Sequence, residues 1–419
     1  MLHETDVAVV GGGLGGSATA AMLGRAGISV LMIDPHPTYR PEFRCEKLDG
    51  VQTEILRKTG LDGAVLQAGT YDGESWVARF GHVIDKRKGD QYGIMYDTLV
   101  NTIREQIPTH VPIIKSKATA IQTSGDRQII TLSDGGQISA RLAVVATGLS
   151  VSLLDQLGLR RDILSSNHSV SVGFDIEPVG RSAFEFPALT YYCHRPSERM
   201  AYVTLFPIGA SMRANLFGYR DLHDPVFRQL RREPVDTLRA MMPRLGNIIG
   251  DFDVTGFMQV RPIDLYATRG YRQPGIVLVG DAFSTSCPAA GTGARKALND
   301  VERLCNHIIP AWLATPGMST EKIEMFYDDP IKRKIDDWSL AKAFGLRSLS
   351  TGIGLSWSFR RSARAALRAS IGAARAGRKA LGRARPDGGT TREAGAGAAL
   401  SHRTSGKEAA RNDIGLRSS

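Results

Sequence analysis

The stretch DVAVVGGGLGGSATAAMLGRAGISVLMIDP, residues 6–35, joins an apolar run, a glycine cluster, a run of small residues and a second apolar run that ends in Asp34. This order predicts a strand, a tight turn, a helix and a second, parallel strand. Gly11, Gly13 and Gly16 follow the spacing GxGxxG at the turn. In such a unit the first glycine permits the turn, the second admits a pyrophosphate group, and the third lets the helix pack closely on the strand.

The same unit predicts a dinucleotide-binding site. The helix begins beside Leu14, and the backbone N–H groups at a helix N-terminus attract phosphate. Asp34, at the end of the second strand, would accept hydrogen bonds from an adenosine ribose. The alternative is an ordinary tight turn between a strand and a helix, and the motif by itself does not distinguish NAD from FAD.

A second glycine-rich stretch, GDAFSTSCPAAGTG at residues 280–293, follows the apolar run GIVLVG. It resembles the second FAD motif of the FAD-dependent monooxygenase family of para-hydroxybenzoate hydroxylase and its reductase and halogenase relatives. The resemblance implies that Asp281 binds the ribityl and pyrophosphate part of FAD. It also implies that the loop and the helix start lie under the flavin ring, through Pro288, Gly291, Thr292 and Gly293. The alternative is a buried strand that leads into an ordinary capped helix.

The resemblance spans about residues 5–310 and implies two further contacts with FAD. Arg44, downstream of the second predicted strand, corresponds to an arginine of the family that contacts FAD, and a solvated surface arginine is the alternative. Gly148 ends an Ala-Thr-Gly sequence that stands at the family's middle motif, in a form closer to the halogenase and geranylgeranyl-reductase branches. The histidine common after GDA is missing, since Phe283 and Ser284 occupy those positions, and Tyr96 stands where relatives often have an arginine.

The predicted fold is α/β: a discontinuous Rossmann-type FAD-binding domain with an inserted mixed β-sheet substrate domain and a basic C-terminal tail. The FAD-binding domain comprises residues 1–165 and 272–339. Alternating apolar and polar residues predict that the substrate domain, residues 166–271, is mainly sheet. Residues 340–385 are expected to be helical, and residues 386–419, rich in Ala, Arg, Gly and Ser, are expected to be disordered.

Several elements are placed by their patterns. Within the insertion we expect strands near 168–176, 189–195, 200–208 and 212–219, and a helical segment at 225–245. Outside it, Asp134, Gly135 and Gly136 predict the turn of a hairpin.

The resemblance implies an FAD-dependent oxidoreductase that acts as a monooxygenase. NAD(P)H would be the electron donor, and reduced FAD would capture dioxygen as a C4a-hydroperoxide and pass one oxygen atom to an apolar or aromatic small molecule. A flavin-dependent reductase of a prenyl or lipid-like double bond and a flavin-binding protein without turnover are the alternatives.

No acid, base or metal-binding cluster can be singled out for catalysis. The predicted sheet of the insertion would roof the flavin, and its aromatic residues would be placed to stack on a flat substrate, although core packing is the favoured alternative for each one. These residues are Tyr191, Tyr192, Tyr202 and Phe206. Arg261, upstream of the second motif, would meet substrate or cofactor or else form a structural ion pair.

The chain has 419 residues, 42% of them apolar, and a formal net charge of +11. The charge is concentrated at one end, because residues 340–419 contain 16 basic and 4 acidic side chains. This composition predicts a solvated tail or a contact with an anionic membrane surface. Nucleic acid is an unfavoured partner because no nucleic-acid-binding fold accompanies the basic segment.

The remaining composition bears on location. Four scattered cysteines argue against a disulfide framework or a zinc site; they are Cys45, Cys193, Cys287 and Cys305. No stretch is long and apolar enough for a membrane-spanning helix. The expected location is the cytoplasm, or the inner face of the membrane as a peripheral protein.

Overall fold

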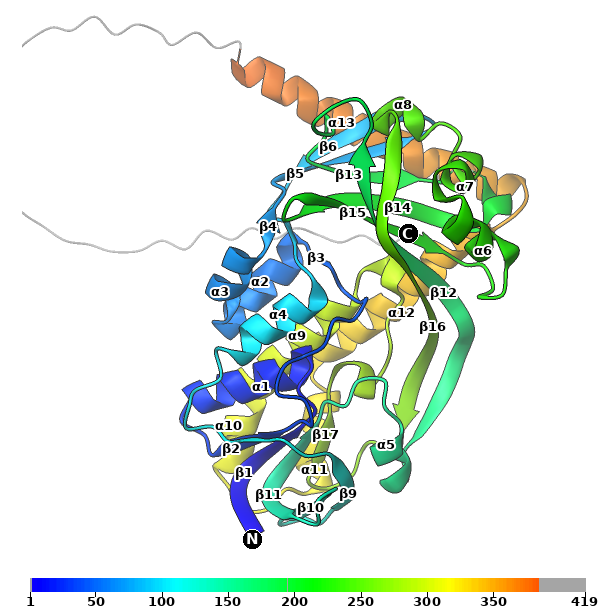
Figure 1. The fold of residues 1–419 in the computed structure, drawn as a ribbon. Coiled ribbons are helices and arrows are strands. Elements are labelled where there is room, and N and C mark those ends of the chain that lie inside the picture. The colour runs from blue at the N-terminus through cyan, green and yellow to red at the C-terminus, as the bar shows by residue number, and fades with distance from the viewer. Residues whose placement is uncertain (1, 194, 384–419) are drawn as a thin grey trace, which may run out of the picture. The chain divides into compact units, whose positions relative to one another are not determined.

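The structure is a computed structural model that describes residues 2–193 and 195–383 of the chain. Met1–Ala374 form one compact unit and Arg375–Ser419 a second, of which only the helical residues 375–383 are described. The predicted disorder of residues 386–419 therefore concerns residues outside the described part. Two seven-stranded sheets and the helices around them make up the first unit (Figure 1).

The first sheet has the strand order β8-β2-β1-β11-β10-β9, with β17 paired to β11. Its strands are β1 (Leu2–Val10), β2 (Val30–Ile33), β8 (Ile113–Ile114), β9 (Ala118–Gln122), β10 (Gln128–Leu132), β11 (Gln137–Val145) and β17 (Ile276–Leu278). The central pairs β1–β2, β1–β11 and β11–β17 are parallel, and β9, β10 and β11 form an antiparallel extension. Gly135, at φ +84°, turns the chain between β10 and β11, which confirms the predicted hairpin.

The predicted strand-turn-helix-strand unit is confirmed as β1, α1 (Leu14–Arg25) and β2. The turn is tight because α1 starts against the end of β1. A Cβ atom on Gly16 would lie 1.8 Å from the carbonyl oxygen of Gly11, so only glycine fits there. A Cβ atom on the neighbouring Gly15 would lie 3.4 Å from Val279, which is an ordinary contact.

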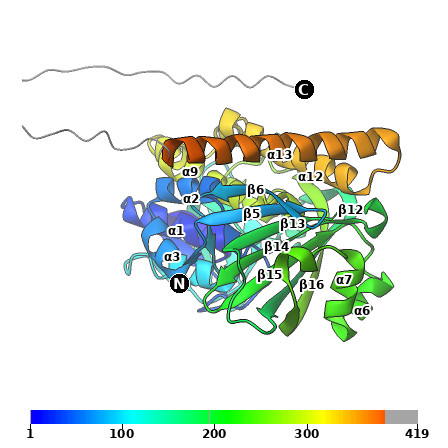
Figure 2. The same ribbon diagram turned by 90° about the horizontal axis from the view of Figure 1, so that it is seen from above.

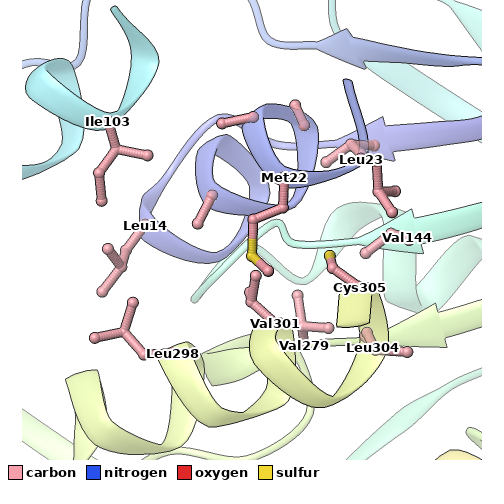
Figure 3. Close-up of a cluster of buried hydrophobic side chains, with 14 of the residues drawn as sticks. Leu14, Met22, Leu23, Ile103, Val144, Val279, Leu298, Val301, Leu304 and Cys305 are labelled. Carbon is pink, nitrogen blue, oxygen red and sulfur yellow. The ribbon is translucent and has the colours of Figure 1, made fainter. Parts of the chain in front are cut away.

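Helices pack on one face of the first sheet and bury a continuous apolar core. They are α1, α2 (Gly50–Thr59), α3 (Asp62–Ala68), α4 (Tyr96–Arg104), α9 (Gly293–Arg303), α10 (Ile309–Leu313) and α11 (Thr320–Tyr327). Figure 3 shows Met22 of α1 and Val301 of α9 pointing toward each other, with Val144 of β11 to one side of the pair. The helix that follows the second glycine-rich stretch is α9, and a π-helical turn at Leu304–Ile308 continues it.

The second sheet has the order β16-β12-β15-β14-β13-β5-β6. Its strands are β5 (Glu74–Arg79), β6 (His82–Lys88), β12 (Arg160–Pro178), β13 (Ala188–Tyr192), β14 (Met200–Ile208), β15 (Ser211–Gly218) and β16 (Phe252–Arg269). β12 and β16 have 19 and 18 residues and pair antiparallel from Arg160–Arg269 to Pro178–Phe252. They carry the chain into the insertion and out of it again (Figure 1). The predicted strands of the insertion are confirmed, whereas β16 was not predicted because Gly256 and Pro262 break its pattern.

The second sheet extends beyond the predicted insertion of residues 166–271. β5 and β6 come from residues 74–88, and β5 joins the sheet by parallel pairing with β13. β12 also begins earlier, at Arg160. A sheet can recruit any segment whose backbone groups reach its edge, and neither strand carries a sequence signal that names its partner.

Short elements complete the unit. They are β3 (Lys47–Leu48), β4 (Thr70–Tyr71) and β7 (Tyr92–Gly93), which form a small sheet, with α5 (Ser152–Gln156), α6 (Pro225–Arg232), α7 (Pro234–Met241) and α8 (Gly246–Ile249). Helices α6 and α7 bury Phe227, Leu230 and Leu238 against one face of the second sheet. They confirm the predicted helical segment at 225–245.

The C-terminal helices are α12 (Pro330–Thr351) and α13 (Leu355–Arg383). The described chain from Pro330 to Arg383 is helical except for a turn at residues 352–354. Up to Ala374, α13 runs beside the edge strands of the second sheet (Figure 2), where a Cβ atom on Gly372 would lie 2.6 Å from the carbonyl oxygen of Ile84 in β6. Within the described residues, none of the helices has the length and apolar character needed to span a bilayer.

We predict that Gly16→Ala destabilises the protein and Gly15→Ala does not. The methyl group added at position 16 must displace the backbone of Gly11, and overpacking of this kind costs about 1–3 kcal/mol. At Gly15 the methyl group has room. The check is urea unfolding of both variants followed by circular dichroism, and equal midpoints for the two variants would contradict the close packing of α1 on β1.

Candidate functional site

A cavity of about 430 Å³ lies between the first sheet and one face of the second. Its floor is made by the segments that follow β1, β2, β11 and β17, so it opens at the carboxyl ends of the parallel strands. Open α/β sheets bind ligands at this edge, and a volume of about 300–1,000 Å³ is typical of small-molecule sites. All of the predicted cofactor residues except Gly16 line it: Gly11, Gly13, Leu14, Asp34, Arg44, Gly148, Asp281, Pro288, Gly291, Thr292 and Gly293.

The first glycine loop brings the N-terminus of α1 to the cavity. Gly11 has φ +104°, and a Cβ atom on it would lie 2.6 Å from the carbonyl oxygen of Ala146. Gly13 is the residue before α1, and no side chain at this position caps the first N–H groups of the helix. The first turn of α1 also contains no acidic residue. The positive end of a 12-residue helix therefore faces the cavity without a protein anion, as a phosphate site requires. Gly16 lies below the loop and serves its close packing.

Asp34 holds the glycine loop in place. Its carboxylate accepts hydrogen bonds from the N–H groups of Gly12 at 2.6 Å and His36 at 2.9 Å. Arg104 of α4 lies 3.2 Å from the same carboxylate and donates to the carbonyl oxygen of Gly12 at 2.6 Å. A carboxylate has further lone pairs, so these bonds leave Asp34 able to accept a ribose hydroxyl. The sequence reasoning did not find Arg104.

The second motif is connected to the first part of the chain by an ion pair. Asp281 follows β17, and its carboxylate lies 2.6 Å from Nη1 of Arg44. Arg44 also contacts Glu42 at 2.8 Å and its guanidinium lies over the ring of Tyr96, so it is not a solvated surface arginine. Burial alone would raise the pKa of Glu42, but the charge and hydrogen bond of Arg44 outweigh it and lower that pKa to about 2. Two predicted cofactor residues therefore meet as a charged pair at the cavity.

Helix α9 brings a second N-terminus to the same cavity. Gly291, at φ +65°, turns the chain after Pro288, and the helix starts at Gly293. The Thr292 hydroxyl makes no capping bond to the helix, because it lies 2.6 Å from the hydroxyl of Ser339 in α12. No acidic residue occupies the first turn of α9. This arrangement matches the one at α1 and favours negative charge near the loop.

Buried charges hold the second motif from below. Asp300 of α9 accepts a hydrogen bond from the N–H of Gly280 at 3.1 Å and another from Nζ of Lys332 at 2.9 Å. Burial lowers the pKa of Lys332, but the negative charges of Asp300 and Asp336 outweigh this effect and raise that pKa. Lys296 donates to the hydroxyl of Ser284 at 2.6 Å. Buried Lys296 thus supports the loop at Ser284, one of the positions where the family's histidine is missing.

The wall of the cavity opposite the glycine loops is a face of the second sheet. Tyr202 and Phe206 line it, as expected, together with Thr204 of the same strand and Phe217 of β15. Tyr191 lies on the opposite face and is fully buried in the core, which confirms core packing, the alternative favoured for it. Successive residues of a strand point to opposite faces, so Tyr191 and Tyr192 cannot share one. Tyr192 packs on Tyr202 with ring centroids 5.4 Å apart.

Three buried side-chain oxygen atoms that belong to cavity-lining residues have no hydrogen-bond partner within the described chain. They are Oγ1 of Thr147, Oγ of Ser171 and Oδ1 of Asn215. An unsatisfied buried polar atom costs about 1–3 kcal/mol, so such atoms at a cavity indicate a bound partner. Together with the two uncapped helix ends, they fit a ligand that carries phosphates at one end and a polar ring system at the other, as FAD does.

A buried ion pair borders this wall, and its carboxylate partner Glu46 itself lines the cavity. Arg213 of β15 donates two hydrogen bonds to Glu46, at 2.8 and 2.9 Å. Burial raises the pKa of Glu46, and its hydrogen bonds with Arg213 and Asn215 act in the opposite direction. The side-chain amide of Asn215 is therefore oriented by Glu46, while its Oδ1 atom has no hydrogen-bond partner among the described residues.

The remaining residues named in the sequence analysis lie at the cavity edge or in the core. Gly148 has φ +60° and turns the chain at the cavity edge. Arg261 lines the cavity. It also donates to Glu42 and to the carbonyl oxygen of Phe43, so it forms the structural ion pair that was the alternative to a contact with substrate or cofactor. The four cysteines are free thiols, and Cys287 is a buried residue of the second glycine-rich stretch. The described residues contain no cluster of His, Cys, Asp or Glu that could hold a metal ion.

Sequence reasoning missed part of the cavity wall. Thr204 had a signal, because it stands two residues from both Tyr202 and Phe206 on one strand. Asn215 and Phe217 share the same two-residue spacing. Glu46 and nearby Phe43 come from an irregular segment whose position only the folded chain defines.

Comparison with known proteins places this geometry in a family. Residues 4–312 match the model of the family described as FAD binding domain. The chain is 24% identical over 359 residues to 3-demethoxyubiquinol 3-hydroxylase of Escherichia coli (strain K12), covering 78% of this chain and 87% of that protein. It is 25% identical over 329 residues to a ubiquinone hydroxylase of Rhodospirillum rubrum, covering 73% and 72%.

A solved structure shows the same fold. The p-nitrophenol 4-monooxygenase of Pseudomonas putida DLL-E4 superposes with a TM-score of 0.71 at 17% identity, covering 88% of this chain and 94% of that one. The resemblance inferred from the two glycine motifs is confirmed, and so are the α/β fold class and FAD as the cofactor. The chain belongs to the FAD binding domain family, and it is an FAD-dependent oxidoreductase of the flavin monooxygenase type.

Proposed function

We propose that this monooxygenase adds one oxygen atom to a small aromatic compound held between the second glycine motif and the face of the second sheet. The observation that carries the proposal is the composition of that face. Tyr202, Phe206 and Phe217 provide flat apolar walls, and Ser171 and Asn215 place unpaired polar atoms among them. Such a face suits a ring that carries a polar substituent. The relatives named for ubiquinone and 3-demethoxyubiquinol support this class of substrate.

The same geometry supports an assignment of the residues that hold FAD. The Gly11–Gly13 loop and the N-terminus of α1 would bind the pyrophosphate, and Asp34 the ribose. Asp281 and Arg44 would bind the ribityl and pyrophosphate part. The segment from Pro288 to Gly293 would lie along the flavin ring, and the N-terminus of α9 would favour negative charge there.

The bound FAD supplies the reduction of dioxygen that makes one oxygen atom transferable. The chain's own residues exclude water, hold the ring system against the sheet face and orient the substrate. In the balanced reaction, substrate, dioxygen, NAD(P)H and a proton give hydroxylated product, NAD(P)+ and water. NAD(P)H is the donor typical of the family, and we propose that this chain uses it.

Asn215 is the residue we propose for orienting the substrate. Its amide N–H group is engaged by Glu46, which Arg213 holds by two hydrogen bonds. Its Oδ1 atom is left as an acceptor beside the cavity. A substrate hydroxyl or amino group can donate to this atom, so we infer that the substrate carries such a donor on its ring.

We further propose that the protein is peripheral on an anionic membrane surface. The basis is the charge of residues 340–419, with 16 basic and 4 acidic side chains. Anionic lipids attract clustered Lys and Arg side chains. Apolar aromatic substrates also concentrate in membranes, so a position at the surface would bring enzyme and substrate together.

Oxygen transfer can be tested directly. Full-length protein loaded with FAD is incubated with NADH or NADPH, isotopically labelled dioxygen and either p-nitrophenol or 3-demethoxyubiquinol. We expect one labelled oxygen atom in the product by mass spectrometry, with NAD(P)H consumed in equal amount. A product that gains two hydrogen atoms and no label would instead establish the reductase alternative.

The FAD contacts predict that Asp281→Asn weakens FAD binding. The change removes the charge that pairs with Arg44 at the cavity, and hydrogen bonds to charged groups contribute about 1.5–3 kcal/mol. We expect the Kd for FAD to rise at least about tenfold, measured by fluorescence titration of apoprotein. Asp253→Asn, at an exposed position of β16, is the matched control and leaves the Kd unchanged. An unaltered Kd in the Asp281 variant would refute the assignment.

Substrate orientation predicts that Asn215→Leu raises KM for the aromatic substrate about tenfold, because one buried hydrogen bond is lost. The Kd for FAD should stay the same, because the proposal places Asn215 on the substrate side. Steady-state kinetics and FAD titration make the comparison, with exposed Asn247→Leu as the control. A lower FAD affinity with unchanged KM would show that Asn215 contacts the cofactor instead.

A further inference from the structure

Helix α13 has one face against the protein and one face free within the first unit. On the inner face Arg361 donates to the carbonyl oxygen of Gly352 at 2.7 Å, and the guanidinium of Arg368 lies 4.7 Å from the ring centroid of Tyr192. These contacts fix which side of the helix points away between Leu355 and Ala374.

The outer face carries a row of exposed apolar side chains. Leu355 is 91% exposed, Phe359 74% and Leu367 62%, and the row continues with Ile371. Together with Ala363 these residues follow a spacing of four, which makes successive members neighbours along one inclined ridge. Because each step of four advances about 40° around a helix of 3.6 residues per turn, the ridge winds from the outer face at Leu355 toward the flank of the helix at Ile371, which is only 42% exposed. Ile353, in the turn before α13, is 86% exposed next to the same end. Isolated exposed apolar residues are ordinary, whereas a continuous row of them indicates a contact surface.

The charge around this ridge has a single sign. Residues 355–383 include no Asp or Glu, and Arg360 and Arg364 are exposed directly beside the ridge. The sequence beyond Ala374 adds further Arg and Lys. The partner of this face must therefore offer both an apolar interior and negative groups at its boundary.

We propose that the outer face of α13, with the turn at Ile353, lies in the interface of an anionic lipid bilayer, parallel to its surface. This inference rests on the peripheral location proposed above and assigns the contact to a particular face. A helix with an apolar ridge flanked by arginines binds in this way: the apolar side chains enter the boundary between headgroups and acyl chains, and the arginines pair with lipid phosphates.

Two other occupants fit the face less well. A nucleic acid would pair with the arginines but would leave the Leu and Phe side chains in water, so the ridge would serve no purpose. A second copy of the chain, in a two-fold arrangement, would bring like-charged arginines of both copies together. The bilayer satisfies the apolar and the charged groups at the same time.

The test is flotation of the full-length, FAD-loaded protein with vesicles of phosphatidylcholine alone or of phosphatidylcholine with phosphatidylglycerol. We expect binding to the anionic vesicles only, weakened by added salt. The double variant Leu355→Ser/Phe359→Ser should lower the partition coefficient at least about tenfold, since two large apolar side chains no longer enter the bilayer. The double variant Arg360→Gln/Arg364→Gln should reduce both binding and its dependence on salt.

The matched control is Phe257→Ser, which removes a 93% exposed aromatic side chain from β16 and should leave vesicle binding unchanged. Equal binding by the Leu355→Ser/Phe359→Ser variant and the parent would overturn the proposal and point to the charged tail alone. Binding to duplex DNA without binding to vesicles would overturn it in favour of nucleic acid.

Transfer of labelled oxygen to p-nitrophenol, measured in the same preparations, separates the two proposals. Leu355 and Phe359 lie outside the cavity, so their variant should keep its FAD content and its oxygen transfer. A parent protein that transfers oxygen and does not float refutes only the membrane contact. A parent that floats and transfers no oxygen refutes only the proposed reaction.

Discussion

The parallel pairing of β17 with β11 is the interaction on which the rest of the structure depends. It places Val277 beside Val144, while β1 pairs with the other edge of β11. The chain segments after these strands therefore emerge at one edge, although the two glycine motifs lie far apart in the sequence. Arg44 and Asp281, 237 residues apart, can then meet at 2.6 Å. Without this pairing the second glycine motif would not reach the cavity that the first motif lines.

The long pair β12–β16 makes that return compatible with a large insertion. Because both strands run antiparallel along nearly their whole length, the chain leaves and re-enters the first sheet at neighbouring points. The same two strands carry the second sheet to its position over the cavity. The cavity thus has a polar floor of backbone donors and an aromatic roof, and each belongs to a different sheet. A cofactor with a phosphate end and a ring end matches this division.

Charged side chains are paired around the cavity and unpaired by acidic residues of the same helix on α13. Around the cavity, charges are paired: Arg44 with Asp281, Arg213 with Glu46 and Lys332 with Asp300. Each pair fixes a loop or a strand that borders the site, and burial of one partner without the other would be costly. On α13 the exposed arginines beside the apolar ridge face solvent, which is the arrangement of a surface made for an external partner.

The order of residues along the chain was enough to predict the βαβ unit, both FAD motifs, the strands of the insertion and the α/β class, because each has a local pattern of glycines or alternating apolar residues. The folded chain added what those patterns do not contain. β5 and β6 joined the second sheet, Tyr191 turned into its core and Arg104 reached the glycine loop. Asn215 and Glu46 became neighbours in the same way. The physical reason is that backbone conformation and strand periodicity depend on neighbouring residues, whereas strand pairing and side-chain contacts depend on which distant segments the folded chain brings together.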